Sequence, residues 1–214
     1  HLSANLSLLA EHIPKPGISQ IAYTSEPDSI LWAILTDGSF VSMTYKRDEN
    51  VVAWHRQIIG GTGVEVESIS AVPGIGGTFD TLYMIVKRTI NSATHRYVEF
   101  LENRFEPTTL TDKDDAFFVD SGLTYSGGST STITGLSHLE GQSVVVFANG
   151  ATHPNKTVAS GQITLDRATT KCHVGLQYTS KMVTLPLNAA MATGTSQGKT
   201  KRINEVVLRL YKSL

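Results

Sequence analysis

The stretch that decides the fold is ILWAILTDGSFVSMTY, residues 30–45. Two apolar runs, residues 30–35 and 40–45, flank the polar tetrapeptide TDGS at residues 36–39. An Asp-Gly pair between two such runs is typical of a β-hairpin turn, because glycine readily adopts the positive φ angles of tight hairpins. The stretch therefore predicts two antiparallel strands joined by a short turn.

The pattern continues on the C-terminal side of this hairpin. A polar loop at residues 46–50 precedes a third predicted strand at residues 51–56. The same order of elements recurs about one propeller-blade length later, a blade being ~40–50 residues, with strands at residues 66–72, 82–88 and 95–101. Two such modules cannot pair their own edge strands, so we expect propeller-like blades of a larger platform. The alternative is one antiparallel sheet with an accidental internal similarity.

A different period precedes the first blade. Leu2, Leu6, Leu9 and Ile13 recur at the spacing of one helix face. The Pro-Lys-Pro-Gly stretch at residues 14–17 would end such a helix, because proline lacks the backbone N–H. The sequence therefore predicts one short N-terminal helix.

The second half of the chain changes character after a boundary at residues 106–109. Short strands are predicted at residues 117–120, 132–134, 143–148, 162–165, 171–176 and 181–187, with turns at Gly127-Gly128 and Pro154-Asn155 among others. This spacing is typical of a small β-barrel or sandwich. Residues 191–198 read as a flexible linker. The segment KRINEVVLRLYKS, residues 201–213, predicts a last strand that returns to the first sheet.

The expected fold is mainly β. Residues 1–110 plus 199–214 would form a partial propeller-like domain of antiparallel blades, and residues 111–198 a small β-barrel inserted into it. The chain has 214 residues, enough to bury a sizeable core.

Composition excludes several classes of protein. Charged residues make up 17% and the net charge is −1, so no global field draws the chain to nucleic acid or an anionic membrane. The single cysteine, Cys172, excludes an intramolecular disulfide and a cysteine-rich zinc site. No apolar run approaches the roughly 18 residues of a membrane span. A chain that opens on His1 without signal-peptide features is expected to be a fragment of a longer protein.

Few residues have the spacing of a catalytic, phosphate-binding or metal-binding site. Glycine-rich stretches at residues 60–63 and 74–77 lack the Gly-Lys-Ser/Thr ending of a phosphate loop and are interpreted as hairpin loops. Cys172 and His173 are adjacent, so in a strand they face opposite ways and cannot act together as nucleophile and base. The acidic group at residues 112–120 lacks the spacing of a calcium loop and reads as a solvated linker. We expect no catalytic residue, metal or cofactor.

Basic residues gather in two places, at residues 46–47 and 199–202. A solvated rim is the simple interpretation. The alternative is the lining of a DNA conduit, where a few cations in each subunit multiply around a ring. The candidate DNA-facing residues are Lys46, Arg47, Lys201 and Arg202.

Several stretches follow one another in a specific order: SLLAEH at residues 7–12, LWA and Asp-Gly within 31–38, VAWH at 52–55, RTIN and RYVE within 88–99, GLSHLEG at 135–141 and KRI to LY within 201–211. This order resembles a family of tail proteins of short-tailed bacteriophages (podoviruses), the tail tubular (nozzle) or DNA-stabilisation proteins. No single motif carries the resemblance, which spans almost the entire chain.

The resemblance implies a non-enzymatic virion component, made in the bacterial cytoplasm and built into the phage tail. Such proteins form a ring of identical copies below the portal and adaptor, pass the genome during ejection, and anchor fibres or spikes. The resemblance implies non-specific contact with DNA in transit. It implies no catalytic residues, and none is carried over.

Two other functions stay open. A receptor- or glycan-binding β-module on the virion would need exposed aromatic residues grouped in a groove; we expect the candidates, Trp32, Trp54, Tyr83 and Tyr97, to lie in the core instead, because each is part of an apolar strand. A hydrolase of cell-wall or capsule sugars ranks last, because paired carboxylates across a cleft cannot be located from sequence.

Overall fold

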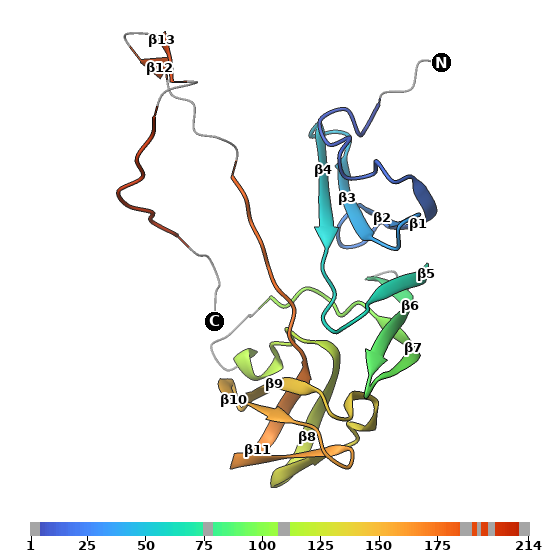
Figure 1. Cartoon of the computed structure of the whole chain (residues 1–214), viewed down its shortest axis with the longest axis vertical. Coiled ribbons are helices and arrows are strands. Elements are labelled where there is room, and N and C mark those ends of the chain that lie inside the picture. The colour runs from blue at the N-terminus through green and yellow to red at the C-terminus, as the bar shows by residue number, and fades with distance from the viewer. Residues whose placement is uncertain are drawn as a thin grey trace. The chain divides into compact units, whose positions relative to one another are not determined.

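The computed structural model of the chain describes residues 5–74, 79–106, 112–184, 190–191, 194–196 and 200–209. The chain divides into two units, residues 1–179 and residues 180–214. The first unit is mainly β, as expected, and consists of three antiparallel sheets (Figure 1).

Sheet A contains the hairpin that the sequence predicted. Its strands are β1 (Ile18–Thr24), β2 (Ile30–Leu35), β3 (Phe40–Lys46) and β4 (Val51–Gln57), hydrogen-bonded in that order. Ile34 is in register with Phe40 and Ile30 with Thr44. At the turn Gly38 has a φ of 81°, and Asp37 Oδ1 accepts a hydrogen bond from the Ser39 N–H over 3.0 Å. The side-chain acceptor and the glycine thus fix the turn where the sequence placed it.

Sheet B is the second predicted module. It contains β5 (Glu65–Pro73), β6 (Asp80–Ile90) and β7 (Ala93–Phe100), again in chain order. Sheets A and B pack face to face through one apolar cluster. Sheet A contributes Trp32, Ile34 and Phe40 to this cluster, and sheet B contributes Val66, Ile69, Leu82, Met84 and Val86. The two sheets therefore stack as two separate layers rather than forming one continuous sheet.

Residues 5–16 cover the other side of sheet A without forming a helix. Ile13 packs against Ala33, Leu35 and Val41, and hydrogen bonds from residue i+3 to residue i make consecutive turns. The expected N-terminal helix is therefore wrong for these residues. A helix of this length is marginal without an apolar face to bury, and Leu9 is 97% exposed.

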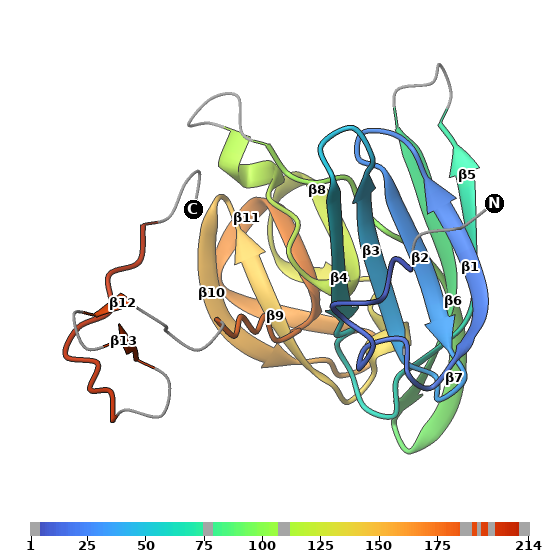
Figure 2. The same ribbon diagram turned by 90° about the horizontal axis from the view of Figure 1, so that it is seen from above.

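Sheet C lies beside this stack and curls around its own core (Figure 2). Its strands are β8 (Asp120–Thr134), β9 (Ser143–Ala148), β10 (Ala151–Thr157) and β11 (Gln162–Leu176), in the order β10-β9-β11-β8. Two short 3₁₀ helices, η1 (Asp112–Asp115) and η2 (Ser137–Leu139), precede β8 and β9. The apolar core includes Ile133, Leu136, Leu139, Val144, Val146, Ile163, Leu165, Cys172 and Val174.

Several strand boundaries predicted for this region are wrong. Strand β8 runs through Gly127-Gly128, β10 runs through Pro154-Asn155, and β11 joins two segments that were predicted as separate strands. Register shifts interrupt the β10–β9 and β11–β8 pairings, for example between Thr164 and Thr169. Such bulges let a long strand bend and continue past residues that would break a flat ladder.

The second unit contains the two-residue strands β12 (Ala190–Met191) and β13 (Gly194–Thr195), which pair with each other. Residues 181–184 and 200–209 belong to no strand, so the strands expected there are not present in the described part of the unit. Residues 185–189 and 210–213 lie outside the described residues. The insertion of the barrel into the first domain stays a prediction.

Candidate functional site

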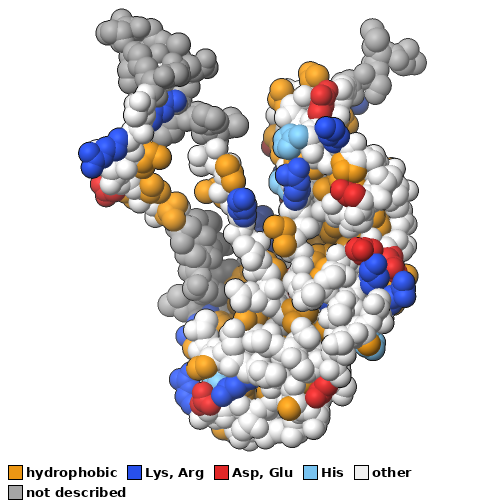
Figure 3. All heavy atoms as spheres, viewed as in Figure 1, with side chains coloured by type: hydrophobic (Ala, Val, Ile, Leu, Met, Phe, Trp, Pro, Cys, Tyr) orange, Lys and Arg blue, Asp and Glu red, His pale blue; other side chains and the backbone are white. Residues whose placement is uncertain are grey.

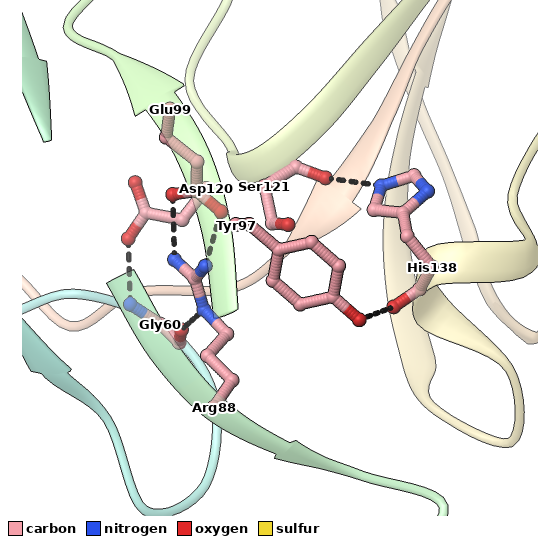
Figure 4. A network of polar contacts seen from close by, with 7 residues as sticks. All are labelled: Gly60, Arg88, Tyr97, Glu99, Asp120, Ser121 and His138. Atoms are coloured by element: carbon pink, nitrogen blue, oxygen red, sulfur yellow. Dashed lines mark hydrogen bonds and ion pairs between the residues drawn. The ribbon is translucent and has the colours of Figure 1, made fainter. Parts of the chain in front are cut away.

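The most elaborate polar arrangement lies where sheet B meets sheet C, and we call it the junction network (Figure 4). It consists of Gly60, Arg88, Tyr97, Glu99, Asp120, Ser121 and His138. Strand periodicity explains how Arg88 enters it. Alternate residues of β6 from Leu82 to Ile90 point to the buried side, and Arg88 occupies one of these positions with a fractional exposure of 0%.

The guanidinium of Arg88 is held on several sides. Arg88 Nη1 and Nη2 donate to the two carboxylate oxygens of Glu99, the second over 3.0 Å. Arg88 Nε donates to the carbonyl oxygen of Gly60 over 2.9 Å. An arginine with its fork matched to a carboxylate in this way is a strong and directional pair. Both oxygens of Glu99 are thereby occupied.

Asp120 connects the loop between sheets A and B to the start of β8. Its Oδ2 accepts a hydrogen bond from the Gly60 N–H over 2.6 Å. Burial raises the pKa of Asp120, and the Gly60 hydrogen bond opposes that shift. Gly60 cannot carry a side chain here, because a Cβ would lie 2.5 Å from the carbonyl oxygen of Gln177.

Tyr97 and His138 extend the network into sheet C. The Tyr97 hydroxyl donates to the His138 carbonyl oxygen over 3.1 Å, and His138 Nε2 lies 2.9 Å from the Ser121 carbonyl oxygen. Since a carbonyl only accepts, His138 carries its proton on Nε2. Burial raises the pKa of Tyr97. Each residue of the network thus forms a hydrogen bond with another residue of the network, and the arrangement orients sheets B and C.

A pocket of about 460 Å³ lies on one side of sheet C. Its walls come from residues 102–106, the region of η1, and strands β8 and β11; the lining includes Phe105, Asp115, Phe117, Thr124, Ser126, Lys171 and His173. The buried His173 ring contacts Thr124 Oγ1 and the Asp114 carbonyl oxygen, each over 2.8 Å. Lys171 forms an ion pair with Asp115. Aromatic walls with polar side chains between them suit a small polar ligand.

The structure places the four predicted DNA-facing cations in different units. Lys46 ends β3, Arg47 follows it in a turn, and both side chains are exposed. Lys201 and Arg202 are exposed residues of the second unit. Basic and acidic side chains lie next to one another on the face shown in Figure 3. The joint role of the four cations stays a prediction.

The aromatic residues expected in the core divide into two groups. Trp32 is buried, and Trp54 and Tyr97 are half-buried and pack against the apolar clusters. Tyr83 is 41% exposed, so its expected core position is wrong. It is at an outward position of β6, where the alternation of the strand directs the side chain away from sheet A.

Two features of the junction network were not predicted from the sequence. Residues 60–63 connect sheet A to sheet B rather than closing a hairpin within one sheet, and Arg88 was assigned no role. The apolar alternation of β6 is the signal that could have identified Arg88 as buried. Residues 75–77 lie outside the described residues.

Two further properties concern the described part of the chain. There, no group of three or more His, Cys, Asp or Glu side chains is arranged to hold a metal ion. Nor does any helix in those ranges have the length and apolar character to cross a membrane.

No protein-family model matches this chain, and no curated protein matches its sequence. The resemblance to podoviral tail proteins therefore stays a prediction.

Proposed function

We propose that this chain is a structural component of a bacteriophage tail, of the nozzle or tail tubular type. It acts by assembling with copies of itself around the path of the genome, and it offers a platform to the adaptor and to fibres or spikes. One observation carries the proposal: two antiparallel sheets stack face to face like neighbouring propeller blades, and apolar side chains remain exposed on their outer sides. Stacks of this kind gain stability from further copies.

The junction network supports a scaffold role. Its carboxylates are occupied by donors from the chain itself, Glu99 by Arg88 and Asp120 by Gly60. Groups tied up in this way hold sheets in fixed positions and are not poised to move protons on a substrate.

DNA binding tests the conduit part of the proposal. The variant Lys46→Glu/Arg47→Glu should bind duplex DNA more weakly than the wild type, with a shallower dependence of log K on log salt, because phosphate contacts release counterions. Lys113→Glu/Arg167→Glu is the matched control, since both residues are exposed in the first unit and the net charge changes equally. Equal loss in both variants would reject a DNA-facing role for Lys46 and Arg47.

Electron microscopy tests the assembly. The purified protein should form closed rings, and in a virion that carries this chain, gold-labelled antibodies should mark the tail. Label on the capsid or in the host cytosol alone would reject the proposal.

The pocket of sheet C favours a second candidate function, a glycan-binding module of the virion. Phe105 and Phe117 provide apolar walls, and Ser126, Lys171 and Asp115 provide polar groups, the combination that sugars need. The variant Ser126→Trp would fill the pocket, whereas Ser129→Trp, on the same strand outside the lining, is its control. This function would be established by saturable binding on a glycan array that Ser126→Trp abolishes and Ser129→Trp leaves unchanged.

A further inference from the structure

The outer side of sheet B carries an unusually apolar surface, which we call the sheet B outer face. Its exposed members are Tyr83 (41%), Ile85 (38%), Val98 (76%) and Phe100 (56%). Ile85 is in register with Val98 and Tyr83 with Phe100, so the four side chains form two adjacent cross-strand pairs. The Tyr83 and Phe100 rings lie 6.1 Å apart.

The size of this surface suits a protein interface. At these fractional exposures the four side chains leave roughly 400 Å² of apolar surface in contact with water. A standard interface buries about 800 Å² on each partner, a little over half of it apolar. The sheet B outer face can therefore form the apolar centre of one such contact.

Charged residues occupy only the other end of this face. Glu65 pairs with Lys87 over 2.5 Å, and Glu67 pairs with Arg96 over 2.7 Å. Each carboxylate already has its cation, so these pairs form a neutral rim and do not require a charged partner. A partner with an apolar surface therefore fits the sheet B outer face.

A second apolar surface lies on the outer side of sheet A, and we call it the β1 stripe. It consists of Ile18 (44%), Ile21 (60%) and Tyr23 (51%). Ile21 is in register with Ala33 and Tyr23 with Leu31, so both point to the side of sheet A that faces away from sheet B. The stack thus has two different apolar surfaces on its two outer sides.

Two different surfaces on opposite sides are best covered by a head-to-tail contact. A two-fold contact would pair each surface with itself and leave the other exposed. A head-to-tail contact covers both surfaces, and its repetition gives a ring when the rotation between copies closes and a filament when it does not. The chain already contains one apolar contact between the two sheets, in which Trp32, Ile34 and Phe40 of sheet A pack on sheet B.

We propose that the β1 stripe of one copy packs on the sheet B outer face of the next copy. The partner is a second copy of this chain, and the contact is the subunit interface of the ring, so this inference rests on the proposed function. The contact places the edge strand β1, beside the part of sheet A that residues 5–16 cover, against sheet B of the next copy.

Complementary variants test the contact. Ile21→Arg and Val98→Arg each place a charge on one surface, at exposed positions where folding is not disturbed. Each variant alone should be monomeric by light scattering, and an equimolar mixture should give a dimer, because each copy keeps the surface that the other lacks. Leu123→Arg, at a position of sheet C that is 43% exposed, is the control and should assemble as the wild type does.

The other outcomes overturn the inference in distinguishable ways. If Ile21→Arg assembles normally while Val98→Arg does not, the contact is two-fold, and the ring can still form by another route. If the mixture stays monomeric, the two surfaces do not meet. If the wild type is monomeric at every concentration, the assembly part of the proposed function fails as well.

Disulfide trapping gives a second readout. Ile21→Cys and Val98→Cys on separate copies should form a cross-linked dimer on oxidation, whereas each variant alone should not. The native Cys172 is buried and does not compete. Cross-linking of Val98→Cys to itself, in place of the mixed dimer, would contradict the head-to-tail contact.

Discussion

Arg88 and Glu99 form a buried ion pair that runs diagonally across sheet B. Arg88 is in register with His95, and Glu99 with Met84, yet the guanidinium reaches the carboxylate and bonds to both of its oxygens. The side chain of Arg88 is 0% exposed and that of Glu99 is 17% exposed. Two long side chains therefore lie along the inner surface of the sheet, where the loop at Gly60 and Gly61 contacts Arg88.

Removal of one member of this pair should be strongly destabilising. Arg88→Met leaves Glu99 without its cation, and breaking a buried pair costs about 3–5 kcal/mol. Lys87→Met, one residue earlier, breaks the exposed pair with Glu65 and should cost about 0–1 kcal/mol. Urea unfolding measures both. Arg88→Met/Glu99→Leu should lose less than the sum of the two single variants, and strict additivity would show that the two side chains do not interact.

Asp120 should make the wild type less stable as the pH rises from acid. Burial raises its pKa above the ordinary 3.8, so the folded state binds the proton more tightly than the unfolded state does. Stability from this group is present below 3.8 and is lost as the pH rises through the folded value. In Asp120→Asn this side chain no longer titrates. The free energy of unfolding of the variant, relative to that of the wild type, should therefore increase as the pH rises from 3 to 7. A constant difference across that range would contradict this.

Asp80 should show the opposite slope. The N–H groups of Ser25 and Glu26 donate to its carboxylate and lower its pKa below 3.8. The stabilisation is therefore present above 3.8 and is lost as the pH falls through the folded value. Asp80→Asn should be less stable than the wild type at neutral pH, with the deficit vanishing in acid. The same unfolding series measures this variant.

Two glycine substitutions should change the stability of the protein in different directions. Gly60→Ala places a Cβ 2.5 Å from the Gln177 carbonyl oxygen, and the resulting shift of the junction should cost about 1–3 kcal/mol. Gly128→Ala, in strand β8, meets no atom within 4 Å and should be neutral or stabilise by about 0.5–1 kcal/mol. Thermal unfolding compares the two. Equal effects would show that the backbone approach at Gly60 is not tight.

Cys172 should be unreactive until the protein unfolds. Its side chain lies in the core of sheet C, and burial raises its pKa to about 11. The thiol is therefore protonated at neutral pH and inaccessible to reagents. In the native protein, a disulfide reagent should modify Cys172 only as fast as the core opens. In the protein unfolded in urea, modification should be quick. Rapid stoichiometric modification of the native protein would contradict this placement.

Local sequence signals located the elements of sheets A and B well. The Asp-Gly turn and its apolar flanks predicted the β2–β3 hairpin, and largely apolar runs bounded by loops predicted β4 and β6. The same reasoning failed for sheet C. Gly127-Gly128 and Pro154-Asn155 are strong turn signals, but bulges carry β8 and β10 past them, and only pairing with distant strands decides that.

The junction network could not be read from the sequence. Asp120 meets Gly60 across 60 positions, and Tyr97 meets the His138 carbonyl across 41. No local pattern encodes such partners, since they depend on how three sheets pack. Arg88 is the exception, because its inward position follows from the alternation of β6.

The sequence by itself determined that this chain is mainly β, where its first hairpin turns, and that it has one cysteine and almost no net charge. These properties follow from composition and from the two-residue period of strands, which act over a few neighbouring residues. The tertiary structure alone decided which face of each sheet is covered, which charges are buried together and which apolar side chains stay exposed. Burial is a property of packed layers, and it brings together residues that the sequence keeps far apart.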